Sequence, residues 1–405
     1  MASVRRVTSV PDPTAGIYLF FPPNALYPLD VRIDIAPVRD FQALGQTWRA
    51  LEEEAPGLSF FQSWTWVGCL AEERYSDPVL LRALGTGGRV VGLALFNRRH
   101  GRLCLAESGE AALDAPFIEH NAPLLAADAG PGTLAALLCA AWRVPGVRRL
   151  VLSGVPPAIV TAAGGVAYSL QERQAPWLDL DTVRAQAPGG DWMATLSANT
   201  RYQLRRSMRH YAMRGALMAE PAGTEEQALA WLDALTALHG ETWHRRGQSG
   251  AFATPYLLRF HRALVARALA RGELDLLRVT AGGTVVGYLY NFRLRGRIYA
   301  YQSGLDYADA GAHGKPGLTC HALAVERALA TGERAYDFLG GAARYKLSLA
   351  NATSPLLWAA AVPNWSPLGV AARLRRIWLS GTWRAGLLTK FRSMAGNTSR
   401  RHSAP

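Results

Sequence analysis

The stretch from Gly296 to Lys346 constrains the fold more than any other part of the chain. Ile298–Leu305 has the composition of a β-strand, Pro316–Thr331 has the apolar spacing of a helix, and Tyr336–Leu339 reads as a second strand. A loop rich in glycine joins the first strand to the helix. The segment therefore predicts a strand–loop–helix–strand unit whose helix begins at a loop with little side-chain bulk.

The elements around this unit follow an order that occurs twice. Each half is expected to begin with helices, to continue as a meander of strands around glycine turns, and to end with a helix and a strand. We predict an α+β fold made by tandem duplication of one unit. The predicted parts are an irregular N-terminal segment 1–29, an N-terminal domain 30–185, a C-terminal domain 190–363 and a basic amphipathic tail 366–405.

Composition places the chain among folded proteins. It has 405 residues, 49% of them hydrophobic and 19% charged, which suits two globular domains. No apolar run approaches the ~18 residues that span a bilayer, and no signal peptide is visible, so a cytoplasmic location is expected. The four cysteines are scattered without metal-ligand spacing, so no metal site is predicted.

The net charge of +13 is concentrated in two segments. Residues 366–405 contain eight Lys or Arg residues and no acidic residue, and a second cluster lies between Arg201 and Arg214. Because the rest of the chain is close to neutral, the charge argues against nucleic acid as a partner. The tail alternates apolar residues with arginines, which favours weak contact with a membrane surface at its inner face. The alternative is a helix packed on the C-terminal domain with its basic face in water.

An ordered set of short motifs in the second half resembles a known family. The motifs are Trp192-Met-Ala-Thr-Leu-Ser-Ala-Asn-Thr-Arg201, Leu238-His239 with Trp243 and Gly247, Tyr301-Gln-Ser-Gly304, Asp337-Phe-Leu-Gly-Gly341 and Tyr345-Lys346. Together they resemble the GNAT (GCN5-related N-acetyltransferase) enzymes of the cellulose-biosynthesis CelD/BcsL group. That group is similar to the Fem-type aminoacyl transferases, which carry two GNAT folds in one chain. The resemblance implies tandem GNAT-like folds, each a mixed, largely antiparallel sheet flanked by helices.

The resemblance also implies a site for an acyl-CoA co-substrate. In GNAT folds the loop and helix N-terminus after a central strand hold the pyrophosphate on backbone N–H groups. The matching residues here are Gly311, Gly314, Lys315 and Gly317. The usual motif Gln/Arg-x-x-Gly-x-Gly/Ala is absent, and a flexible surface loop with turn glycines is the alternative interpretation.

Five residues are candidates for the chemistry. The resemblance places a functional lysine at Lys346, where an ammonium could stabilise a developing oxyanion; the alternative is a solvated lysine after a strand. Asp337 could orient Lys346 or Tyr345, or it could simply cap a turn. His239 could act as a base for the acceptor, although a histidine near a helix C-terminus also stabilises the helix dipole. Tyr301 and Ser303 are expected on one face of a strand, where a hydroxyl could protonate the leaving thiolate.

The acceptor is expected to contact a second group of residues. Arg201 and Arg205 lie one helical turn apart and could bind phosphate or carboxylate, unless they form a solvated face. Trp243 and Tyr345 are the aromatic candidates, with Trp243 also suited to the core. The sequence thus predicts transfer of an acetyl or acyl group to an amine or hydroxyl of a sugar, a polysaccharide precursor or a similar acceptor. The alternatives are a Fem-like aminoacyl transferase that uses aminoacyl-tRNA and a non-catalytic GNAT-like adaptor in envelope polysaccharide assembly.

Overall fold

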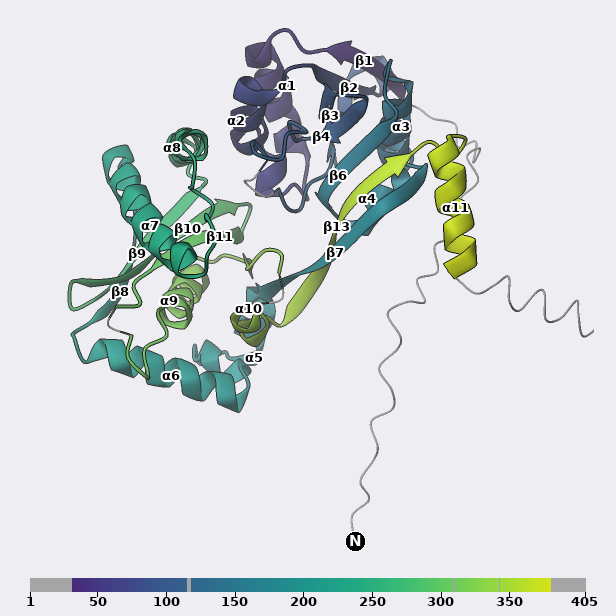
Figure 1. Ribbon diagram of the computed structural model, residues 1–405. Coiled ribbons are helices and arrows are strands. Elements are labelled where there is room, and N and C mark those ends of the chain that lie inside the picture. The colour runs from purple at the N-terminus through teal and green to yellow at the C-terminus, as the bar shows by residue number, and fades with distance from the viewer. Residues whose placement is uncertain (1–30, 115–117, 309, 342, 380–405) are drawn as a thin grey trace, which may run out of the picture.

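The protein is built on one continuous β-sheet that passes through both halves of the chain (Figure 1). A computed structural model describes residues 31–114, 118–308, 310–341 and 343–379. Within them the sheet has 13 strands, in the order β1-β2-β3-β4-β6-β13-β7-β12-β11-β10-β9-β8, with β5 paired to β3. The predicted segment 1–29 and most of the predicted tail lie outside the described residues.

The N-terminal half forms one end of this sheet. An antiparallel meander of β1 to β4 is followed by β6, which runs parallel to β4. Its strands are β1 (Arg32–Pro37), β2 (Pro78–Leu84), β3 (Val90–Arg99), β4 (Arg102–Leu105), β5 (Leu124–Leu125) and β6 (Arg149–Val155). Its helices are α1 (Phe41–Glu54), α2 (Trp64–Arg74), α3 (Thr133–Ala140) and α4 (Pro157–Ala162).

The C-terminal half forms the other end with a second meander. Strands β8 to β11 pair antiparallel, and β12 then pairs parallel to β11. These strands are β8 (Leu217–Pro221), β9 (Leu274–Ala281), β10 (Thr284–Leu294), β11 (Arg297–Leu305) and β12 (Ala335–Asp337). The helices are α5 (Leu180–Gln186), α6 (Ala198–Ala212), α7 (Glu225–Arg245), α8 (Pro255–Ala270), α9 (Pro316–Ala330) and α10 (Arg344–Leu349). The predicted strand–loop–helix–strand unit is thus β11, α9 and β12.

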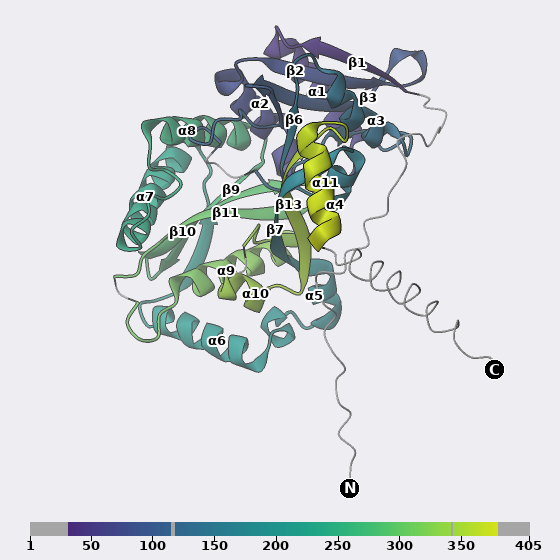
Figure 2. The same cartoon turned by 45° about the vertical axis from the view of Figure 1, so that its right-hand side comes forward.

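Two long strands join the halves. β7 (Val166–Asp179) and β13 (Ala352–Val362) pair antiparallel along the whole of β13, and they run side by side between the halves in Figures 1 and 2. β13, from the C-terminal end of the fold, also pairs with β6, while the last residues of β7 pair with β12. Each half therefore supplies a strand that completes the sheet of the other. A final helix, α11 (Pro367–Leu379), packs against β7.

The core is continuous across the two halves. Alternate side chains of β10 face opposite sides of the sheet, so that Tyr290 and Phe292 lie in a cluster with α7 and α8, and Leu289 lies in another with α9. The ring of Phe60, from the N-terminal half, stacks on Phe292 at 4.0 Å between centroids. Trp66 of α2 meets Phe260 of α8 edge to face at 5.7 Å. The predicted α+β class is confirmed, and the halves are fixed to each other through apolar contacts.

Each helix in the described segments is too short or too polar to cross a bilayer.

Candidate active site

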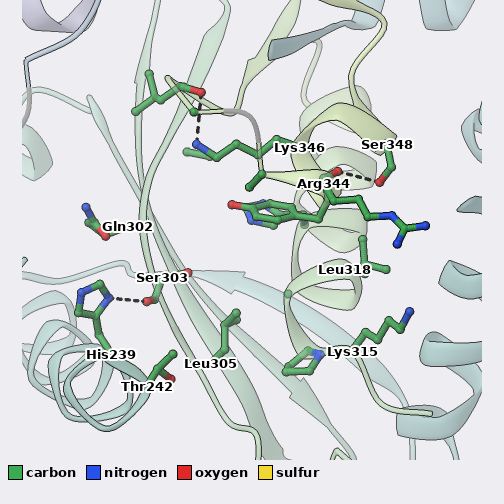
Figure 3. A pocket seen from close by; sticks show the side chains of 18 of the residues that line it. His239, Thr242, Gln302, Ser303, Leu305, Lys315, Leu318, Arg344, Lys346 and Ser348 are labelled. Atoms are coloured by element: carbon green, nitrogen blue, oxygen red, sulfur yellow. Dashed lines mark hydrogen bonds between the residues drawn. The ribbon is translucent and has the colours of Figure 1, made fainter. Parts of the chain in front are cut away.

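The site is a gap that opens in the sheet between two parallel strands. β11 and β12 are paired only where Arg297–Tyr299 lies beside Ala335–Asp337. Beyond that point β11 continues to Leu305 while the chain after Asp337 turns away, and a cavity of about 760 Å³ lies between them (Figure 3). Backbone groups that a continuous sheet would have paired are therefore available to a ligand.

One wall of the cavity is β11, which carries a bulge at Tyr301. Tyr290 of β10 is opposite Gln302 and the next residue, Asn291, is opposite Ala300, so Tyr301 is the extra residue. Its ring lies 5.7 Å from that of Trp66, and its hydroxyl is buried with no hydrogen-bond partner among the described residues. Burial raises the pKa of this hydroxyl. The regular alternation predicted for this strand is wrong here, and the hydroxyl is directed into the aromatic core.

The N-terminus of α9 forms the second wall. Gly314, Lys315 and Gly317 line the cavity together with Pro316, and no side chain of the described residues caps this helix. The Lys315 backbone N–H donates to Ser207 Oγ at 2.8 Å, and the Lys315 ammonium donates to Gln203. Three of the four residues predicted to hold the pyrophosphate therefore line the cavity.

The glycines of this loop are not equivalent. A Cβ atom at Gly317 would meet only the end of the Leu305 side chain, at 3.2 Å. A Cβ atom at Gly314 would lie 2.4 Å from the Ala310 carbonyl oxygen, so the loop itself requires glycine there. Gly311 has φ 53° and does not line the cavity, which indicates a turn position rather than a contact with a ligand.

The third wall is a strained turn at Leu339–Gly341. Leu339 has φ 60°, in the left-handed region that costs a branched residue about 1–2 kcal/mol. Its N–H donates to Asp337 Oδ1 at 2.8 Å, and the Lys346 ammonium donates to the carbonyls of Leu339 (3.2 Å) and Gly340 (2.9 Å). The Gly340 N–H donates to Glu119. Three charged side chains thus hold a strained backbone against the cavity, an arrangement typical of functional sites.

Asp337 belongs to a buried charge cluster beside this turn. The residue is 0% exposed, and its Oδ2 lies 2.8 Å from Arg297 and 3.0 Å from Nε2 of His120. Burial alone would raise the pKa of Asp337, but His120 and Arg297 outweigh it and the pKa is lowered. Burial alone would lower the pKa of His120, but the Asp337 carboxylate outweighs burial and the pKa is raised. Asp337 does not line the cavity, so it acts on the site through the turn.

The carboxyl group of Glu119 and the amino group of Lys346 both line the cavity. Burial raises the pKa of Glu119, although the Gly340 N–H and the Lys346 ammonium both act to lower it. Burial lowers the pKa of Lys346. Glu119 comes from the N-terminal half, in the loop between β4 and β5, and the sequence analysis missed it. Its only sequence signal is a polar run, Glu119-His120-Asn121, inside an otherwise apolar stretch.

His239 is held on both ring nitrogens. Its Nδ1 donates to the Ser303 carbonyl at 3.0 Å (Figure 3), and its Nε2 accepts from the Ala251 N–H at 3.1 Å. This pairing requires the neutral ring, and burial lowers the pKa of His239 further. Although His239 and Ser303 both line the cavity, the contacts favour the structural interpretation of His239. Ser303 also lines the cavity, and its carbonyl accepts the hydrogen bond from His239.

The two arginines predicted to contact the acceptor, Arg201 and Arg205, lie outside the cavity. Arg201 donates to the carbonyls of Ala194 and Leu196, and Arg205 pairs with Asp191 at 2.8 Å. Neither lines the cavity, because the face of α6 that does so carries Asn199, Thr200 and Gln203. Arg201 and Arg205 therefore lie outside this cavity, and their contact with the acceptor stays a prediction.

The two aromatic candidates do reach the cavity. Tyr345 stacks on His321 with ring centroids 5.3 Å apart and 17° between the planes. Burial raises the pKa of Tyr345 to about 12, so it remains protonated at neutral pH. Trp243 lies between His239 and Arg246, at 5.6 Å and 5.5 Å from them.

The charge of the lining is mainly positive. Among the described residues that line the cavity, the basic ones are Arg173, Arg246, Lys315, Arg344 and Lys346, and the acidic one is Glu119. Lys315 and Arg344 point to the same side of the cavity in Figure 3. This balance favours an anionic ligand. No group of three or more potential metal ligands occurs in the described part of the chain.

The chain is similar to known proteins in part of its sequence and in its fold. Residues 198–347 match the acetyltransferase (GNAT) domain family. The fold is similar to that of FemX, with TM-score 0.54 and 11% identity over 80% of this chain and 97% of FemX. It is also similar to a conserved protein of unknown function from Bacteroides thetaiotaomicron, with TM-score 0.51 and 12% identity over 82% of this chain and all of that one. No curated protein matches the sequence.

The family match defines residues 198–347 as an acyltransferase domain of GNAT type. The C-terminal half carries the acetyltransferase domain, and the predicted GNAT fold is confirmed. The narrower resemblance to the CelD/BcsL group stays a prediction.

Proposed function

We propose that this protein transfers an acyl group from acyl-CoA to an amine or hydroxyl of a sugar, a glycan precursor or a similar small acceptor. One observation carries the proposal: the gap between β11 and β12, the uncapped N-terminus of α9 and the turn at Leu339–Gly341 share one cavity. A phosphate group, a thioester and an acceptor could all be held within about 760 Å³.

The donor is proposed to bind with its pyrophosphate at α9. A helix N-terminus with free N–H groups and a positive dipole end favours an anion. Gly317 leaves room for close approach, and Lys315 adds a cation at the same place. Lys315 can release Gln203 to meet a phosphate, because the exchange replaces a bond to a neutral amide by one to an anion.

Transfer requires that the C–S bond of the thioester breaks while a C–N or C–O bond forms. Lys346 is proposed to stabilise the oxyanion on the carbonyl carbon under attack. Glu119 is proposed to accept the proton that the attacking amine or hydroxyl loses, since burial has brought its pKa closer to neutrality. The leaving thiolate takes a proton from water at the open side of the cavity.

Isothermal titration of the full chain with coenzyme A and acetyl-CoA tests the donor site. Gly317→Asp is the blocking variant, because aspartate suits the first turn of a helix but places a negative charge where phosphate would bind. Gly317→Ala is its matched control, since a Cβ there meets only the movable end of Leu305. We expect wild type and Gly317→Ala to bind and Gly317→Asp to lose at least tenfold in affinity. Equal affinity in all three proteins would refute the proposed donor site.

A Fem-like aminoacyl transferase is the second candidate, favoured by the similarity of the fold to FemX over most of both chains. The same cavity would then take the aminoacyl end of a charged tRNA, and the exposed arginines of α6 would lie outside it to meet the RNA. Filter binding with charged tRNA discriminates the two. The second proposal would replace the first if the protein binds charged tRNA in a salt-sensitive way, if Arg205→Gln weakens that binding, and if the protein has no affinity for coenzyme A.

A further inference from the structure

α11 exposes apolar side chains to solvent. Trp365, just before the helix, is 83% exposed, and Leu374 is 58% exposed, with Leu368 and Val370 also exposed. Surface helices ordinarily direct their apolar face to the core and their polar face to water. Large apolar side chains gathered on one exposed element mark a site of contact with a protein or a membrane.

The orientation of the helix follows from its packed side. Gly369 is buried and Ala372 is half-buried, and the helix packs against β7. Helical periodicity places Val370 and Leu374 on the opposite side. The small residues therefore contact the fold, and the larger apolar residues form the outer face.

Positive charge borders this outer face. Arg373 and Arg375 are exposed, and Arg373 donates to Asn364 Oδ1 at 3.0 Å. The chain from 366 to 405 has no Asp or Glu, and its eight basic residues are Arg373, Arg375, Arg376, Arg384, Lys390, Arg392, Arg400 and Arg401. An occupant of the outer face must accept apolar side chains and many positive charges.

We propose that α11 docks on the surface of a membrane rich in anionic phospholipid. Apolar side chains can enter the interface between headgroups and acyl chains, while the flanking arginines pair with lipid phosphates. A second copy of this chain fits less well, because it would bring a second set of uncompensated basic residues to the same place. Figure 1 places α11 at the edge of the molecule and away from α6.

Cosedimentation of the full chain with vesicles tests this proposal. One set of vesicles contains 30% phosphatidylglycerol in phosphatidylcholine, and the other contains phosphatidylcholine alone. Trp365→Ser with Leu374→Ser removes the apolar contact, and Arg373→Gln with Arg375→Gln removes two charges. Met213→Ser is the matched control, because Met213 is an exposed apolar residue, 79% accessible, at the end of α6. Far-ultraviolet circular dichroism checks that each variant is folded.

We expect wild type and Met213→Ser to bind the anionic vesicles and to be released by 0.5 M salt. The apolar double variant should bind at least tenfold more weakly, and the arginine double variant about 25-fold, at about fivefold for each charge. Binding to anionic vesicles that both double variants retain would overturn the proposal, as would failure of the wild type to bind. Self-association that Trp365→Ser with Leu374→Ser abolishes, without vesicle binding, would assign the face to a second copy instead.

Discussion

The buried Asp337 cluster allows a quantitative test of how the halves are held together. Asp337→Asn keeps the shape of the side chain and removes its charge. If the amide oxygen keeps the bond to the Leu339 N–H, the amide nitrogen must face Arg297 and His120, which are donors. Arg297 and His120, which faced a carboxylate, would then face a third donor, inside a site with no exposed atoms of residue 337.

The expected cost follows from the burial of the partners. Removal of one partner from a buried ion pair costs about 3–5 kcal/mol. The Arg297 side chain is 31% exposed and can be solvated in part, so we expect the lower end, about 3 kcal/mol. At about 2.1 cal/mol/K per residue, the 405 residues give an unfolding entropy of about 0.85 kcal/mol/K. Asp337→Asn should therefore lower Tm by about 3–4 °C.

Thermal and urea denaturation followed by circular dichroism measures this change. Asp233→Asn is the matched control, because Asp233 pairs with Arg262 at the surface, where such a pair contributes less than about 1 kcal/mol. The double variant with Arg297→Gln should recover part of the loss, since it removes the cation left without a partner. If Asp337→Asn loses no more free energy of unfolding than Asp233→Asn, the cluster does not stabilise the fold and this reasoning is refuted.

Three further predictions concern the same region. Because Asp337 raises the pKa of His120, the stabilisation from this pair is complete below about pH 6.5 and is lost as pH rises through the folded-state value. Denaturation from pH 5 to 9 should show this loss in wild type, and an equal slope in His120→Gln would contradict it. Glu119→Gln should lower the rate of thiol release from acetyl-CoA by about 10²–10⁴-fold with little change in coenzyme A affinity, whereas a rate within threefold of wild type would exclude Glu119 as the base. Phe60→Ala removes the stack on Phe292 and should lower the free energy of unfolding, measured by urea denaturation, by about 3–5 kcal/mol. A loss below about 1 kcal/mol would mean that the contact between the halves closes around the space left by the missing ring.

The sequence by itself determined the local elements and their order. Strand and helix periodicity found the second meander, the helix now called α9 and the strand after it, because each pattern is set by neighbours a few residues apart. The glycine-rich loop before Pro316 was also recognised, since turn chemistry is local. These signals were sufficient for the α+β class and for the position of the helix N-terminus at the site.

Tertiary structure alone decided what meets at the cavity. The pairing of β13 with β6, the arrival of Glu119 from the other half and the ion pair of Asp337 with Arg297 depend on contacts between residues 40 to more than 200 positions apart. No local pattern specifies such contacts, because they are selected by packing and by the burial of charge once the sheet has formed. The orientation of α6 likewise places Arg201 outside the cavity. The sequence thus located the loop and the lysine, and the fold supplied the acid opposite them.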